Sequence, residues 1–422
     1  MCHHDQIAMG KLLFPLGLGT ALSLMGDATL YTVLPTHTAE AGIALGGVGI
    51  LLGINRAVRL FLNGPAGLAY DRMPRRWLFI PALFIGALST ALYAATQGFW
   101  PLLIGRILWG LAWSGIWVGG ATMILEAAPA HARGRWTGLY QTWFFVGTAL
   151  GALGGGVLTD LLGYAATMWL GAALTAVGGL VALFMLPETS GARDVVTAHA
   201  GGPPVPSPSD RERSADRPTG EVGHALWLAV SMQGINRFIV SGVISATLGL
   251  VIQDWVTTAD IALGVATLTG LVAAGRTVLS MGAAPLAGTI SDRQGNRWSI
   301  VAWSLALGAV GMTLLAVDGP LGILAGISAV AISGGSLQSL ATTLTGDSAN
   351  RAQRGRAIGL LHTAGDFGSA IGPSIAYVLL PLIGLRAVYL GCGVLFLAAL
   401  GPVLHLQRRL PARWRAMDLD KG

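Results

Sequence analysis

Five arginines lie inside stretches of the chain that are otherwise apolar. They are Arg56, Arg59, Arg106, Arg237 and Arg276. A guanidinium binds carboxylate, nitrate or phosphate oxygens through two parallel hydrogen bonds. The same stretches hold only Asp27 and Asp366 as acidic residues, which leaves an excess of three positive charges. We therefore expect an anionic or carboxylate-bearing ligand. The alternative is that the arginines pair with the two carboxylates and hold helices together.

Asp27 is a candidate proton carrier. A low dielectric disfavours its charged form and a nearby arginine favours it, so its protonation can be balanced between the two. Aligning Gly26 with Gly234 places Asn236 and Arg237 at the depth of Asp27 in the second half of the chain. We therefore expect Asp27 to approach Arg237. The alternative is a permanently ionised salt bridge with a structural role.

A second titratable pair consists of His362 and Asp366. Their spacing of four residues places both side chains on one face of a helix. They could carry a proton in place of Asp27, or they could be purely structural.

The elements that position these residues are membrane-spanning helices. The chain of 422 residues is 53% hydrophobic and only 11% charged, whereas a soluble protein carries about a quarter charged residues. Each spanning helix needs about 20 apolar residues. Twelve stretches qualify: 12–35, 43–69, 78–96, 99–125, 137–158, 165–186, 225–252, 261–290, 298–317, 320–345, 357–382 and 387–406. We predict an all-α membrane protein of twelve transmembrane helices.

The proline-rich segment 187–224 divides this pattern into two halves, since such polar sequence cannot bury a core. We predict an N-terminal six-helix bundle over 1–186, a cytoplasmic flexible linker over 187–224, a C-terminal six-helix bundle over 225–408 and a cytoplasmic tail over 409–422. With both termini cytoplasmic, 20 of the 26 basic residues fall on the cytoplasmic side and only Arg386 on the other. This asymmetry is the usual signature of orientation.

The two halves are copies of one another. The Asp71-Arg72 dipeptide returns as Asp292-Arg293 after 221 residues, each with a glycine four residues before the aspartate, Gly67 and Gly288. A second motif, beginning Arg133-Gly134-Arg135, returns with the same offset at Arg354. Duplicated halves that rock about a site near the membrane midplane give alternating access.

With these features the chain resembles the major facilitator superfamily over essentially its whole length. The glycine-aspartate-arginine loop at Gly67–Arg72 is similar to that family's most specific signature. Arg106-x-x-x-Gly110 is similar to a weaker family motif, and Gly147 to Gly155 looks like the glycine-rich motif of proton-coupled exporters. Ala152 stands where that exporter motif has proline, which weakens the case for drug export.

The resemblance implies a secondary active transporter that is coupled to protons and not an enzyme. From the residues described above we predict substrate contacts at Arg56, Arg59, Asn236, Arg237 and Arg276, and proton coupling at Asp27, Arg106, His362 and Asp366. The resemblance also implies conformational gating at Gly67, Asp71, Arg72, Gly288, Asp292 and Arg293.

One alternative is a drug/proton antiporter for hydrophobic or cationic compounds, and another is a non-transporting membrane receptor or scaffold. We expect a monomer in the bacterial inner membrane that acts on a small molecule, with no cofactor, metal or nucleic acid.

Overall fold

The computed structural model describes residues 3–129, 132–188, 219–259, 263–294, 296–317, 319–348 and 354–409. The chain forms two compact units. The first comprises Met1–Pro204 and Leu248–Ala274, and the second comprises Val205–Thr247 and Gly275–Gly422. Most of the predicted linker at 187–224 and nearly all of the predicted tail at 409–422 lie outside the described residues. We treat the two units separately.

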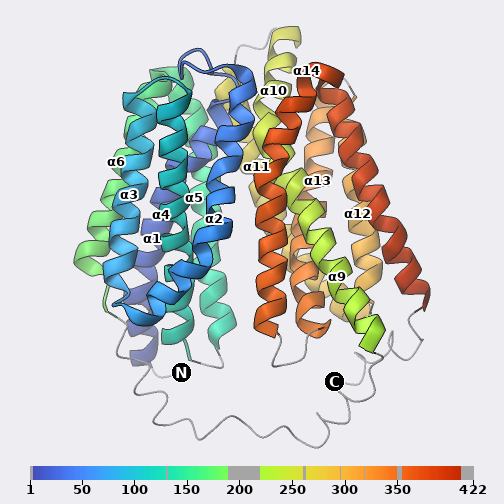
Figure 1. The fold of residues 1–422 in the computed structure, drawn as a ribbon, viewed down its shortest axis with the longest axis horizontal. Helices are drawn as coiled ribbons and strands as arrows, with labels where there is room; N and C mark the ends of the chain where they lie inside the picture. The colour runs from blue at the N-terminus through green and yellow to red at the C-terminus, as the bar shows by residue number, and fades with distance from the viewer. Residues whose placement is uncertain are drawn as a thin grey trace, which may run out of the picture. The chain divides into compact units, whose positions relative to one another are not determined.

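Six helices occupy the first part of the chain (Figure 1). They are α1 (His3–Val33), α2 (Leu45–Arg72), α3 (Arg76–Ala95), α4 (Phe99–Ala127), α5 (Arg133–Leu162) and α6 (Tyr164–Met185). The helix α1 packs against α5 and α6, α3 packs against α4 and α6, and α2 packs against α4. Each follows one of the predicted apolar stretches, with ends that agree within four residues except that α1 begins nine residues before the stretch 12–35.

The second part of the chain is again helical over its described residues. Its elements are α9 (Thr219–Asn236), η2 (Arg237–Ile244), α10 (Ser245–Ala259), α11 (Val265–Gln294), α12 (Arg297–Leu315), α13 (Pro320–Ser348) and α14 (Arg354–Arg409). The first three are continuous and correspond to the predicted stretch 225–252. The helix begins at Thr219, six residues before that stretch.

Eleven described helices are long and apolar enough to cross a membrane, and the last of them contains two predicted spans. Gly384 interrupts α14 with φ 78° and ψ 162°, between the predicted stretches 357–382 and 387–406. The architecture is therefore that of twelve transmembrane helices, as the sequence predicts.

Positive-φ glycines mark the repeat in the backbone itself. Gly98 (φ 102°) precedes α4 and Gly319 (φ 106°) precedes α13. Gly163 (φ 84°) separates α5 from α6, and Gly384 occupies the matching place in α14. Both pairs are 221 residues apart. A side chain is strained in this conformation, so glycine is needed at the same turn in both halves.

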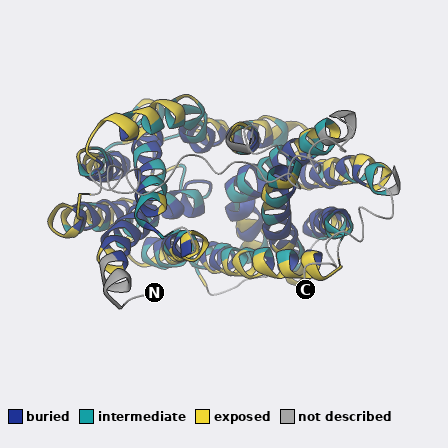
Figure 2. Cartoon of the chain, turned by 90° about the horizontal axis from the view of Figure 1, so that it is seen from below, coloured by how far each residue is buried: buried dark blue, intermediate teal, exposed yellow. Residues whose placement is uncertain are grey.

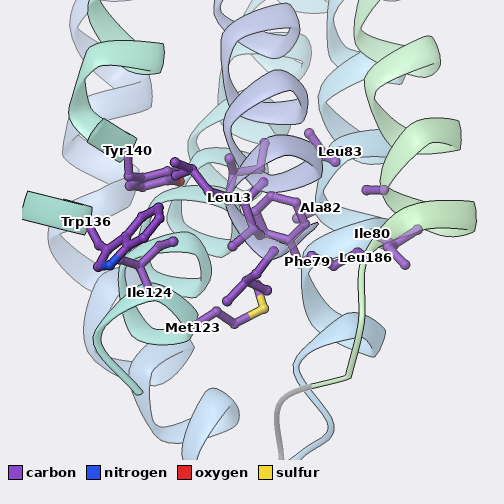
Figure 3. Packing of buried hydrophobic residues seen from close by; sticks show 14 of the residues in the cluster. Leu13, Phe79, Ile80, Ala82, Leu83, Met123, Ile124, Trp136, Tyr140 and Leu186 are labelled. Atoms are coloured by element: carbon purple, nitrogen blue, oxygen red, sulfur yellow. The ribbon is translucent and has the colours of Figure 1, made fainter. Parts of the chain in front are cut away.

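The apolar core of the first unit fills the space between its helices. Buried side chains from α1, α3, α4 and α5 meet there, including Leu13, Phe79, Met123 and Tyr140 (Figure 3). Exposed residues lie on the outer faces of the helices, where many of them are large and apolar (Figure 2). Apolar surface of this kind is what lipid covers.

Candidate functional site

The centre of the candidate site is a buried ion pair between α1 and α4. Arg106 in α4 is wholly buried, and its Nη1 lies 2.6 Å from Oδ1 of Asp27 in α1. The Asp27 side chain is 14% exposed, against 1% for Arg106. Arg106 Nε also donates a hydrogen bond to the Leu51 carbonyl at 2.8 Å. The alignment of the two halves favoured Arg237 as the partner of Asp27, whereas within the first unit the structure pairs Asp27 with Arg106.

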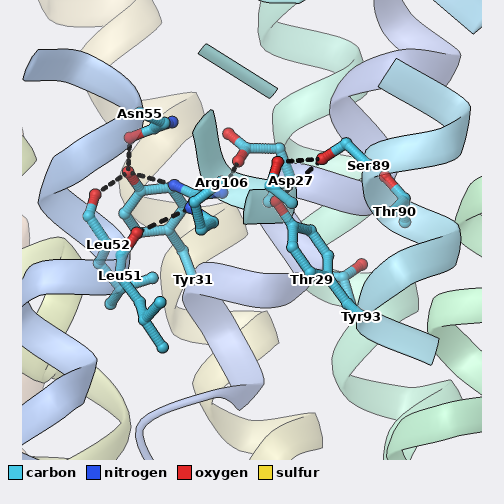
Figure 4. A network of polar contacts seen from close by, with 12 residues as sticks. Asp27, Thr29, Tyr31, Leu51, Leu52, Asn55, Ser89, Thr90, Tyr93 and Arg106 are labelled. Atoms are coloured by element: carbon cyan, nitrogen blue, oxygen red, sulfur yellow. Dashed lines mark hydrogen bonds and ion pairs between the residues drawn. The ribbon is translucent and has the colours of Figure 1, made fainter. Parts of the chain in front are cut away.

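Tyr31 extends this network towards α2 (Figure 4). Its hydroxyl accepts a hydrogen bond from Arg106 Nη2 at 3.1 Å and donates to the Leu52 carbonyl at 2.7 Å. Asn55 Oδ1 lies 3.2 Å from the same hydroxyl. The guanidinium carbons of Arg56 and Arg106 lie 5.2 and 5.1 Å from the centre of the tyrosine ring, within cation–π range.

Sequence reasoning missed Tyr31. The signal that could have found it is its position four residues after Asp27, which places both side chains on one face of α1.

Small residues let the helices approach closely enough to form the network. A Cβ atom on Gly26, next to Asp27, would lie 2.9 Å from Thr90 Cγ2 of α3. A Cβ on Gly110, one turn after Arg106, would lie 2.7 Å from the Asn55 carbonyl of α2. The Arg106-x-x-x-Gly110 spacing thus places an arginine one turn from a close contact between α4 and α2, where it reaches the backbone of α2 and the carboxylate of α1.

Charge in this network is unbalanced. Asp27 is the only acidic residue of α1–α6 that lies more than two positions from a helix end. Arg56 and Arg59 are half-buried and one turn apart on α2. Three guanidiniums thus lie in the interiors of α2 and α4 against one carboxylate in the interior of α1.

A second polar cluster lies in the second unit, at a π-helix. Arg237 begins η2 and its Nη1 donates to Ser241 Oγ at 3.2 Å, while the buried Asn236 donates from Nδ2 to the Gly334 carbonyl at 3.2 Å. Arg276 in α11 donates to the Val240 carbonyl at 3.0 Å and to Ser245 Oγ at 3.1 Å. π-Helical turns are rare in proteins, and those that occur often lie at functional sites. Arg237, Asn236 and Arg276 are therefore brought to one segment, which the sequence did not reveal as π-helical.

His362 and Asp366 in α14 differ in burial. Asp366 is buried and His362 is exposed, although they are one turn apart. The carbonyl of Asp366 accepts a hydrogen bond from Ser369 Oγ at 3.0 Å. Gly365 packs against the Arg237 side chain, so this part of α14 lies beside the second polar cluster.

The signature loops lie at helix ends with exposed charges. Asp292 at the end of α11 binds Arg297 at 3.1 Å, and Arg297 also contacts Asp347. In the first unit, the buried Arg75 binds Glu126 at 2.9 Å. Glu126 and Asp347 are 221 residues apart, so each half ties the loop to the end of its fourth helix through an arginine.

The gating residues predicted in these loops are mostly exposed. Asp71, Arg72 and Arg293 are exposed, and no heavy atom lies within 4 Å of a Cβ built on Gly67. A Cβ on Gly288 would lie 3.9 Å from Ser339 Oγ. These loops therefore have room to make other contacts if the helices move.

The comparisons with known proteins agree with this architecture. The model of the Major Facilitator Superfamily matches residues 16–232 and 226–417. The inner membrane transport protein YajR of Escherichia coli (strain K12) is 29% identical over 185 residues, 41% of this chain and 38% of its own length. A probable 4-methylmuconolactone transporter of Cupriavidus pinatubonensis is 30% identical over 132 residues, 31% of either chain. Tetracycline resistance protein, class E, of Escherichia coli is 30% identical over 178 residues, 41% of this chain and 43% of its own length. The matched segments span less than half of each relative.

Solved structures extend the likeness to nearly the whole chain. A bacterial homolog to the human lysosomal transporter Spinster, in an inward-facing and unoccupied conformation, has a TM-score of 0.73 at 15% identity and covers 97% of this chain and 98% of its own. The human organic anion transporter MFSD10 has a TM-score of 0.62 at 17% identity and covers 94% and 99%. At such identities these structures show the fold alone. Because the family model matches both halves, the chain belongs to the Major Facilitator Superfamily of membrane transporters.

Proposed function

We propose that this protein is a secondary active transporter that moves a small anionic or carboxylate-bearing solute across the membrane by alternating access, driven by protons. The observation that carries the proposal is the charge imbalance around Tyr31. Asp27 neutralises Arg106 at 2.6 Å, and the half-buried Arg56 and Arg59 add two guanidiniums on the adjacent helix. A site with such an excess attracts an anion and repels a cation.

The second unit contributes guanidiniums of the same kind. Arg237 and Arg276 are half-buried and bind neutral oxygens of Ser241, Ser245 and the Val240 carbonyl. These contacts place two guanidiniums beside one segment of the second unit, where they would add to the attraction for an anion. Asn236 would add an amide to this group.

Asp27 is the proposed proton carrier. It is the more accessible member of a buried ion pair, so a proton can reach it while Arg106 stays enclosed. A proton gradient can drive the cycle only if the two access states differ in their affinity for the proton. Buried arginine contacts that change during the cycle would provide that difference. His362 and Asp366 are the alternative carriers.

The signature loops are proposed as conformational latches. Asp71 and Arg72, like Asp292 and Arg293, are exposed at the ends of their helices. A carboxylate there can bind an arginine or the positive end of a helix in one access state and release it in the other. We further propose a monomer in a bacterial inner membrane, with both termini in the cytoplasm.

A second candidate is export of hydrophobic or cationic compounds in exchange for protons. The sequence likeness to a tetracycline resistance protein favours it, although the stretch from Gly147 to Gly155 has Ala152 where the exporter motif has proline. Under this candidate the arginines of the first unit would be structural, and Asp27 would bind the proton and the cation in turn.

Flux into liposomes containing the purified protein separates the two candidates. The panel contains nitrate, phosphate, trifluoroacetate and succinate as anions, and tetracycline and tetraphenylphosphonium as the competing class, each with and without an imposed proton gradient. We expect gradient-dependent flux of at least one anion and none of tetraphenylphosphonium. Gradient-dependent flux of the cation alone would overturn the proposal.

Variants of Arg56 test whether the guanidinium makes the site. Arg56→Lys keeps the charge and loses the planar fork, so anion affinity should fall about tenfold, and Arg56→Ala should lower it further. The matched control is Arg135→Ala, which removes an exposed arginine near the start of α5 and should leave flux unchanged. Normal anion transport by Arg56→Ala would assign this arginine to the structure of the bundle.

A further inference from the structure

We infer that Tyr31 links an anion at Arg56 to the protonation of Asp27, so that proton and anion bind with positive cooperativity and cross the membrane together as symport. The inference rests on the proposed function and adds the sign of the coupling and the residue that transmits it. Tyr31 acts as a positioning residue, since it holds the two arginines rather than the proton.

The contacts of Tyr31 join the two sites directly. Its hydroxyl accepts from Arg106 Nη2 at 3.1 Å, and Arg106 Nη1 binds Asp27 Oδ1 at 2.6 Å. Its ring lies 5.2 Å from the guanidinium carbon of Arg56 and 5.1 Å from that of Arg106. One aromatic side chain therefore contacts the cation of the proton site and a cation of the anion site.

The sign of the coupling follows from the charges. When Asp27 is ionised, its charge cancels that of Arg106, and an anion near Tyr31 is attracted mainly by Arg56. When Asp27 is protonated, Arg106 keeps its bonds to the Leu51 carbonyl and to Tyr31, and its charge is no longer cancelled. An anion then interacts with two guanidiniums, so protonation raises anion affinity. By linkage, a bound anion raises the affinity of Asp27 for the proton by the same factor.

The same arrangement excludes positive cooperativity for a cation. Protonation of Asp27 would add one positive charge to the site and would expel a bound cation, which gives exchange. The same arrangement of charges therefore predicts symport if the substrate is an anion and antiport if it is a cation.

Other ionisable groups around Asp27 do not replace it as the switch. The packed helices present Arg56 and Arg59 from α2, Tyr93 from α3, Arg106 from α4 and Tyr164 from α6, and the loop after α1 adds Glu40, which accepts a hydrogen bond from the Tyr164 backbone N–H at 3.2 Å. The helix α5 has no ionisable side chain from Gln141 to Thr159. Arginines stay charged and phenols ordinarily lose a proton only near pH 10. Asp27 and Glu40 are the carboxylates of this set, and the same loop also holds His37, so Glu40 and His37 each need a control.

The test measures anion affinity against pH in the full-length protein. Nitrate and trifluoroacetate serve as probes because they are anions of strong acids and keep their charge between pH 5.5 and 8. Binding is followed by calorimetry in detergent. We expect wild-type affinity to rise about tenfold on acidification, within the range usual for coupled sites. In Asp27→Asn the affinity should be high and independent of pH.

Variants of Tyr31 separate its two contacts. Tyr31→Leu removes ring and hydroxyl, and the pH-dependent change in affinity should fall below about twofold while binding persists. Tyr31→Phe keeps the ring, and its pH response should lie between those of Tyr31→Leu and wild type. If Tyr31→Leu folds poorly, Tyr31→Phe provides the test of the pH response in its place. Matched controls are Glu40→Gln, His37→Gln and Tyr140→Phe, a buried phenol that hydrogen-bonds Thr20 of α1, and all three should keep the wild-type response.

Flux gives the second readout. Proteoliposomes loaded with a pH indicator should acidify inside when nitrate enters down its gradient. A wild-type pH response in Tyr31→Leu, or affinity that falls on acidification, would overturn the inference and leave anion transport intact. Failure of the wild type to bind either probe at any pH would instead overturn the proposed function.

Discussion

The buried ion pair offers the sharpest test of the structure. Asp27→Ala leaves the guanidinium of Arg106, 1% exposed, with two of its three hydrogen-bonded partners. Removing one member of a buried pair costs about 3–5 kcal/mol, because the remaining charge is uncompensated. The Asp27 side chain is 14% exposed, so water relieves part of this cost and we expect about 3 kcal/mol. In a unit of this size that lowers the melting temperature by roughly 6–12 °C.

Two further variants separate charge from shape. Asp27→Asn keeps an oxygen that can accept a hydrogen bond from Arg106 Nη1. The free energy of unfolding should therefore fall less than in Asp27→Ala, and the difference between the two variants should be about 1–2 kcal/mol. Adding Arg106→Gln to Asp27→Ala removes the uncompensated charge and should recover at least half of the lost stability. The control is Arg237→Gln in the same Asp27→Ala background, because Arg237 lies in the second unit and binds Ser241. It should recover nothing.

Stability is measured by thermal unfolding of the purified protein in detergent, with tryptophan fluorescence as the signal. Accumulation and downhill exchange are measured in liposomes on the same preparations. Asp27→Asn should abolish proton-driven accumulation and still allow exchange. Recovery of Asp27→Ala by Arg237→Gln and not by Arg106→Gln would refute the pairing, and normal accumulation by a well-folded Asp27→Asn would exclude Asp27 as the carrier.

Three other predictions concern helix packing, the proposed latch and the topology. Gly147→Ala should lower the free energy of unfolding by about 1–3 kcal/mol, because its Cβ would lie 2.5 Å from the Ala21 carbonyl oxygen. The control is Gly154→Ala, whose Cβ would have no atom within 4 Å. Both variants gain helix propensity, so the difference between their melting temperatures measures the clash. Asp71→Asn should slow transport severalfold at unchanged melting temperature, and unaltered transport would rule out the latch. In a background without native cysteines, Gln97→Cys and Arg213→Cys should react with an impermeant thiol reagent from opposite sides of the membrane, and reaction from one side would refute the proposed topology.

The helices could be predicted from the sequence because their cause is local. A stretch of about 20 apolar residues is needed to satisfy the backbone in lipid, and this requirement appears directly in composition. The repeat was equally visible, since the turns between helices depend on few residues. Gly98 and Gly319 stand at one such turn with φ 102° and 106°, and glycine is needed there for the same reason in each half.

The partners of the buried charges could not be predicted because they depend on the register between helices. The alignment of Gly26 with Gly234 used sequence identity alone. The contacts give another register. Gly147 packs against Ala21 while its counterpart Gly368 packs against Gly234. A shift of five residues is more than one helical turn, and it moves Arg237 away from the depth of Asp27.

The corrected register also reveals a functional asymmetry between the halves. Gly151 packs against Met25 and its counterpart Gly372 against Phe238, which again gives an offset of 213 residues between α1 and the continuous helix α9–η2. Asp27 then corresponds to Val240, whose carbonyl accepts the hydrogen bond from Arg276. At this position the first half holds a carboxylate that binds Arg106 of its fourth helix, and the second half holds a π-helical carbonyl that binds Arg276 of its second helix. The first partner can take up a proton and cancel or release the charge of its arginine. A backbone carbonyl does not take up a proton, so the contact between Val240 and Arg276 does not depend on pH. We therefore expect the pH dependence at this position to arise in the first unit, from Asp27.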